Sequence, residues 1–166
     1  MTIDILAEPR GAEYHALLQF LGPRSATFAL VWSDQLTFAA SADDMRIRLG
    51  PFERRTERVS EWPGTQLFGS LVTMRHYASS AGALRVLETA EGLYSWQAPA
   101  LPEDLSFSAP DGRTIFASIA HERDAWFEGD VISMASLRAA LTGLELREAH
   151  VPNSPAPQIR DNARDR

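Results

Sequence analysis

The chain has 166 residues and a formal charge of −6, and it contains neither lysine nor cysteine, so all 16 of its basic residues are arginines. These absences exclude a Schiff base, a lysine general base, a phosphate-loop lysine, thiol chemistry, thiolate metal sites and disulfides. The negative net charge argues against a nucleic acid bound through its phosphates and is compatible with a basic protein partner.

Composition and length predict one folded domain. Hydrophobic residues make up 45% and charged residues 23% of the chain, as in folded soluble proteins. We expect a single domain over residues 1–150 and a disordered tail over residues 151–166, which are almost free of apolar side chains. The chain has no signal-like start and no stretch near the ~18 apolar residues of a membrane span, so we expect a cytoplasmic protein.

The first fifty residues predict a strand between two helices. Apolar residues recur at helical spacing over 13–21 and stop at Gly22, which predicts the first helix. Residues 26–32 are short, branched and almost continuously apolar, as in a central strand covered on both faces. Ser41 then predicts the cap of a second helix that ends at Gly50.

The middle of the chain predicts a turn and a second strand. Residues 53–61 alternate in charge sign, as a surface segment does. Residues 62–65 place proline and glycine where a type II turn requires them. Residues 67–77 then predict a strand with Arg75 and Tyr77 on one face.

The remaining elements are a capped helix, a proline-rich loop, a hairpin, a third short strand and a last helix. Ser79 or Ser80 caps the first of these helices and Gly92 suits a left-handed cap at its end. The others are the loop 97–102, the strands 105–108, 114–119 and 124–127, and a helix capped by Ser133. Together the elements predict a single-domain α+β fold with a mixed or mostly antiparallel sheet and about four helices on it.

One charged cluster could carry chemistry. His121, Glu122, Arg123 and Asp124 follow a predicted strand directly, and a histidine oriented by a carboxylate can act as a general base. An extended segment would place His121 and Arg123 on one face and the two carboxylates on the other. A solvated strand end with ion pairs therefore explains the cluster as well as a site does.

A second hypothesis joins two histidines. Arg75 and His76 lie on a predicted strand, and His121 ends another, so the imidazoles could meet across the sheet. With a carboxylate from 103–104 or Asp111 they would form a metal site of the His-His-carboxylate kind. A strand histidine is more often a hydrogen-bonded structural residue, so no metal and no cofactor is predicted.

Arginines concentrate in one segment. Their guanidinium groups could dock an anionic ligand or an acidic partner. Interleaved glutamates offer local pairs that would use up most of that charge. The arginines are Arg46, Arg48, Arg54, Arg55 and Arg58.

Three tryptophans, Trp62, Trp96 and Trp126, lie near predicted loops. Tryptophan at a surface edge supplies a large apolar area and one donor, which suits a protein interface. The alternative is that each ring anchors the core from a loop.

Several segments resemble a group of uncharacterised bacterial proteins, some of which are labelled sporulation-related. The resemblance spans about residues 62–126 and rests on the Trp-Pro-Gly-Thr, Leu-Pro-Glu-Asp-Leu and Ala-His-Glu-Arg-Asp-Ala segments. It departs at 113–116, where the relatives are more aromatic. It implies a recurring domain and transfers no activity.

These observations favour a non-enzymatic binding protein, of the immunity or antitoxin type, that inhibits a protein partner. Binding candidates are the cluster at His121–Asp124, the pair Arg75 and His76, and the three tryptophans. The alternative is a small enzyme or ligand-binding domain with a His/Glu/Arg pocket around His121. A structural subunit that forms a homo-oligomer is the third hypothesis.

Overall fold

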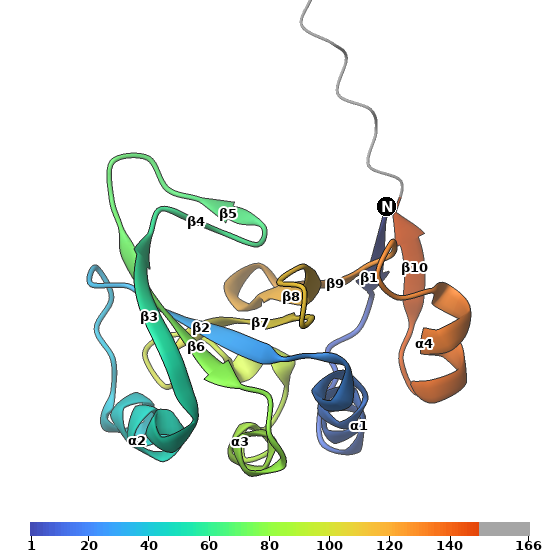
Figure 1. Cartoon of the computed structure of the whole chain (residues 1–166), viewed down its shortest axis with the longest axis horizontal. Coiled ribbons are helices and arrows are strands. Elements are labelled where there is room, and N and C mark those ends of the chain that lie inside the picture. The colour runs from blue at the N-terminus through green and yellow to red at the C-terminus, as the bar shows by residue number, and fades with distance from the viewer. Residues whose placement is uncertain (150–166) are drawn as a thin grey trace, which may run out of the picture.

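The computed structural model describes residues 1–149, in which eight strands form one antiparallel sheet in the order β10-β1-β9-β8-β7-β2-β6-β3 (Figure 1). Its strands are β1 (Thr2–Ile5), β2 (Thr27–Trp32), β3 (Glu53–Val59), β6 (Val72–Ala78), β7 (Glu103–Ser108), β8 (Thr114–Ile119), β9 (Asp124–Glu128) and β10 (Leu146–Ala149). A separate hairpin consists of β4 (Glu61–Trp62) and β5 (Thr65–Gln66). The α-helices are α1 (Ala12–Leu21), α2 (Ala40–Leu49), α3 (Ala81–Leu87) and α4 (Met134–Ala140). The predicted α+β class, with a mostly antiparallel sheet and four helices, is confirmed.

The main core lies between the helices and one face of the sheet, below the strands in Figure 1. A row of aromatic rings crosses this face, one from each of five neighbouring strands. Each ring faces the next in the strand register, with centroids 5.2 to 6.3 Å apart. Such cross-strand pairs hold neighbouring strands in register. The row is Tyr77, Phe28, Phe107, Phe116 and Phe127.

The opposite face of the sheet is partly covered by the β4-β5 hairpin, which lies above the strands in Figure 1. A smaller apolar cluster forms there, where Trp62 and Leu67 pack against Val31 and its neighbours on the sheet. Gly64, at the hairpin turn, has a φ of 81° and lies so close to the sheet that a Cβ would come within 2.5 Å of the Trp126 ring. The turn therefore needs glycine for both its backbone angle and its close approach.

Bulges interrupt the regular alternation of the sheet. In β3, Glu53 lies opposite Tyr77, and Arg55 lies opposite His76, so Arg54 is an extra residue. In β7, the register with β2 shifts next to Asp104, whose φ is 56°. A bulge re-aims the side chains around it, and both of these bulges border the sites described below.

Five strands were not predicted: β1, β3, β10 and the two-residue strands β4 and β5, for which only the turn between them was predicted. The predicted strand 67–77 begins only at Val72, because residues 67–71 form a loop. Ser41 does not cap α2: Ala39 holds that position, and the Ser41 hydroxyl donates instead to the Ala100 carbonyl at 2.7 Å. Gly92 is extended, with a φ of −173°, rather than left-handed.

Other predictions were correct: Ser80 caps α3 and Ser133 caps α4. No helix within residues 1–149 combines the length and the apolar character needed to cross a membrane. The predicted tail at 151–166 and His150 lie outside the described residues.

Candidate functional site

The His121–Asp124 cluster is a turn rather than a continuous strand. His121 and Glu122 belong to the 3-10 helix η4 (Ala120–Glu122), and Arg123 follows in the left-handed conformation with a φ of 58°. The His121 and Glu122 side chains are more than half exposed, and their closest atoms, Nε2 and Oε1, are 3.7 Å apart. This is a loose surface pair and not an oriented acid–base couple.

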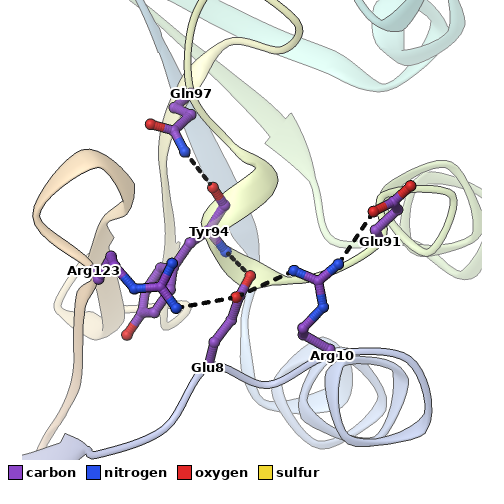
Figure 2. Close-up of polar contacts among 6 residues, drawn as sticks. All are labelled: Glu8, Arg10, Glu91, Tyr94, Gln97 and Arg123. Atoms are coloured by element: carbon purple, nitrogen blue, oxygen red, sulfur yellow. Dashed lines mark hydrogen bonds and ion pairs between the residues drawn. The ribbon is translucent and has the colours of Figure 1, made fainter.

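Arg123 points toward a buried carboxylate, that of Glu8 (Figure 2). The Glu8 side chain is only 8% exposed. It accepts a hydrogen bond from the Tyr94 backbone N–H at 3.1 Å and pairs with Arg10 at 3.3 Å and Arg123 at 3.5 Å. Glu8 thus fastens the start of the chain to the 3-10 helix η3 (Leu93–Ser95) and to the turn before β9.

Tyr94 completes this group, with its ring 5.4 Å from the Arg123 guanidinium. Burial, with smaller effects of Asp124 and Glu8, raises the pKa of Tyr94 to about 12. The phenol is therefore neutral at pH 7, and both Glu8 oxygens are engaged, one by the Tyr94 N–H and the other by the two arginines. The arrangement joins three segments and acts as a structural clamp.

The three predicted tryptophans all turn toward the protein. Trp96 is fully buried and donates to the Tyr14 hydroxyl at 2.8 Å, which donates in turn to the Leu87 carbonyl at 3.1 Å. Trp62, on β4 of the hairpin, packs against the sheet at Val31 and its neighbours. Trp126 is half-buried beside Gly64 and donates to Glu128 at 3.0 Å. Each of their indole N–H groups donates a hydrogen bond to another group of the protein itself.

Asp104 is the partner of Trp62 and the most constrained carboxylate in this region. Its Oδ2 accepts from Trp62 Nε1 at 2.9 Å and its Oδ1 accepts from the Ala120 N–H at 3.1 Å. Burial raises the pKa of Asp104, and burial together with Asp104 raises the pKa of Glu103. Asp104 therefore ties the hairpin to the end of β8.

Arg75 and His76 face opposite sides of the sheet, as adjacent strand residues do. Arg75 lies on the helix side and pairs with Glu53 at 3.0 Å. His76 lies on the other side, opposite Ala29 of the smaller cluster, with its Nε2 at 2.6 Å from Glu57 Oε1.

The two histidines do not converge. His76 lines a hollow with a volume of 270 Å³ that also includes Ser108, the last residue of β7. His121 lies near Glu103 and Asp104 at the first residues of that strand. Within residues 1–149 no group of three or more histidine, aspartate or glutamate side chains is placed to hold a metal ion.

We predict that His76 makes the fold less stable as the pH falls. Burial lowers the pKa of His76 below its ordinary value of 6.5, an effect larger than the opposing hydrogen bond to Glu57. The unfolded chain therefore takes up this proton more readily than the folded protein, so stability is lost as the pH falls through 6.5 toward the folded-state pKa.

Urea unfolding of the wild type and of His76→Gln at a series of pH values measures this effect. Glutamine donates to Glu57 but does not titrate. The wild type should lose stability relative to the variant between about pH 7.5 and about pH 5. Parallel stability curves over that range would contradict the assignment.

The most exposed large apolar side chain in the described part of the chain is Phe68, at 88%. It belongs to the loop between β5 and β6, residues 67–71, called here the Phe68 loop. Both ends of the loop are fixed: the Leu67 N–H donates to the Ser60 carbonyl at 2.7 Å, and Arg58 donates to the Leu71 carbonyl at 3.3 Å. Gly69, with a φ of 81°, forms the bend, and Leu71 is half exposed.

No signal in the sequence marked this loop, because Phe68 and Leu71 fit the apolar pattern of a strand.

No protein-family model matches this chain, and no curated protein or solved structure shows significant similarity to it.

Proposed function

We propose that this protein is a non-enzymatic binding protein that docks a partner protein through the Phe68 loop and thereby occupies the partner's surface, as an immunity-type or antitoxin-like inhibitor does. The observation that carries the proposal is the exposure of Phe68 on a loop held at both ends. A large apolar ring kept in solvent by a fixed backbone costs little conformational entropy when it binds. Aromatic side chains of this kind dominate the binding energy of protein interfaces.

The surroundings of the loop support a partner with an apolar pocket and a basic rim. A hollow of about 480 Å³ lies beside Phe68, lined by Arg58, Ser60 and the loop itself. Arg58 is already paired with Asp34 at 2.6 Å, so the uncompensated charge beside the loop is that of Glu61, which is exposed on β4 and makes no ion pair within residues 1–149. With a formal charge of −6 on the whole chain, the long-range field attracts a basic partner.

We also propose that the chain is an example of the recurring domain that the resemblance implies, and that it is located in the cytoplasm. A small enzyme around His121 has less support, because that histidine is exposed and pairs loosely with Glu122. Phe68 takes the place of the three tryptophans as the proposed anchor, because their indole N–H groups donate to groups of the protein itself.

Affinity capture from the native host tests the proposal with three baits: the wild type, Phe68→Ser and Ile47→Ser. Ile47 is 67% exposed on α2 and serves as the matched control. We expect a partner that the wild type and Ile47→Ser retain and Phe68→Ser loses. Affinity for the purified partner should fall by about 2 kcal/mol, roughly thirtyfold in Kd, in Phe68→Ser.

The Phe68 ring makes few contacts inside the fold. The free energy of unfolding of Phe68→Ser should therefore lie within about 0.5 kcal/mol of that of the wild type. Equal retention of every captured protein by Phe68→Ser would refute the proposal. A homodimer that dissociates only in Phe68→Ser, seen by sedimentation, would replace the partner with a second copy of the chain.

A further inference from the structure

The hollow beside His76, called here the His76 hollow, is separate from the Phe68 loop. It lies between the edge strand β3 and the turn that joins β7 to β8. One wall carries Arg54 and Arg55, the floor carries Thr27, His76 and Ser108, and the other wall carries Pro110 and its neighbours.

The bulge in β3 explains how two consecutive arginines line one hollow. In a regular strand Arg54 and Arg55 would point to opposite faces of the sheet. Arg54 is instead the extra residue of the bulge, which departs from that alternation. Both residues line the same hollow.

The charges around the hollow leave one guanidinium uncompensated. Glu57 is shared between Arg55 at 3.3 Å and His76 at 2.6 Å. Across the hollow, Asp111 is held by Arg113 at 2.8 Å. Arg54 makes no hydrogen bond or ion pair within residues 1–149, and neither do the hydroxyl groups of Thr27 and Ser108 over the same residues.

We propose that the His76 hollow binds a small molecule through an oxyanion group, a phosphate or a carboxylate. The guanidinium fork of Arg54 suits bidentate contact with either oxyanion, and Arg55 adds positive charge. The free hydroxyls of Thr27 and Ser108 supply neutral donors on the floor.

The size of the hollow sets the size of the ligand. Its volume of 270 Å³ exceeds that of a bare phosphate ion and lies just below the usual range of ligand pockets. Ala26, Ala109 and Pro110 give it apolar surface beside the charged wall. The ligand is therefore a small molecule with an apolar body and one oxyanion, and phenyl phosphate and benzoate have this chemistry.

Titrations followed by amide NMR shifts test the proposal with phenyl phosphate, benzoate and neutral benzyl alcohol at low ionic strength. We expect saturable shifts at residues 26–27, 54–55, 76 and 108–112 with at least one of the two anions and none with benzyl alcohol. The anion that binds more tightly identifies the oxyanion that the site prefers.

Two variants should change the affinity in opposite directions. Arg54→Gln removes the free guanidinium and should weaken binding at least about tenfold. Glu57→Gln removes the competing carboxylate, keeps an acceptor for His76 and should strengthen binding roughly threefold. Arg138→Gln, at an exposed arginine on α4, is the matched control and should bind as the wild type does.

The absence of saturable shifts with both anions would overturn the proposal. So would an Arg54→Gln variant that binds with unchanged affinity, or a benzyl alcohol response equal to that of the anions. Because Arg54 and Phe68 lie in separate sites, Phe68→Ser should leave anion binding unchanged. Failure of the partner proposal and failure of this one are thus distinguishable.

Discussion

Replacing Trp96 with alanine is expected to lower the free energy of unfolding by about 4 kcal/mol, the largest effect of any single change considered. Trp96 is fully buried, and its removal leaves a cavity in the main core. It also removes the hydrogen bond to Tyr14, which links η3 to α1 and, through the Leu87 carbonyl, to α3. Urea unfolding followed by far-UV circular dichroism measures the loss.

Two further variants show whether burial is the cause. Trp96→Phe keeps most of the ring and loses only the donor and part of the volume, so its cost should be about 2 kcal/mol. Trp126→Ala removes a half-buried ring and should cost about 1.5 kcal/mol. If Trp96→Ala were no more destabilising than Trp126→Ala, the central place of Trp96 in the core would be refuted.

Asp104→Ala is expected to cost about 3 kcal/mol. The change leaves two donors without an acceptor, Trp62 Nε1 and the Ala120 N–H, and each unsatisfied buried donor costs about 1–3 kcal/mol. Position 104 also has a φ of 56°, which aspartate and asparagine tolerate better than alanine. Part of this cost is offset, because alanine removes a carboxylate whose ionised form is disfavoured by burial.

Asp104→Asn is the control for the backbone angle. Asparagine tolerates the same φ and can accept one of the two hydrogen bonds, so the expected cost is about half that of alanine. Trp62 fluorescence reports the local change, since the indole should become more exposed when the hairpin is no longer held. Equal stability of Asp104→Ala and the wild type in urea would show that the hairpin does not depend on this carboxylate.

Regular patterns in the sequence predicted most of the elements. The helix α1 and the strand β2 follow from their apolar spacing, and the β7-β8 hairpin follows from the turn at Pro110 and Gly112. The edge strand β3 was missed because it pairs on one side only and exposes most of its charged side chains, so its sequence lacks an apolar alternation. The four-residue strand β1 does alternate polar and buried apolar residues, but over the shortest length at which alternation indicates a strand, and β10 has only one large apolar residue, Leu146.

The contacts that define the sites could not be predicted, because they join residues far apart in the chain. Glu8 meets Tyr94 across 86 positions and Arg123 across 115. Trp96 and Trp62 were recognised as residues near loops, but their direction depends on acceptors 82 and 42 positions away. The His76 hollow depends on a bulge, which shifts side chains without leaving a mark in the composition of β3.

The place of β1 in the sheet determines when folding can be completed during synthesis. This strand leaves the ribosome before every other described strand, yet its two neighbours are β9 and β10, whose residues end at Glu128 and Ala149. Until those segments emerge, Ile3 and Ile5 have no strand to pair with and stay available to other chains. Closing the sheet thus requires contacts between the first and last described strands, which makes this step slow compared with forming the local hairpins.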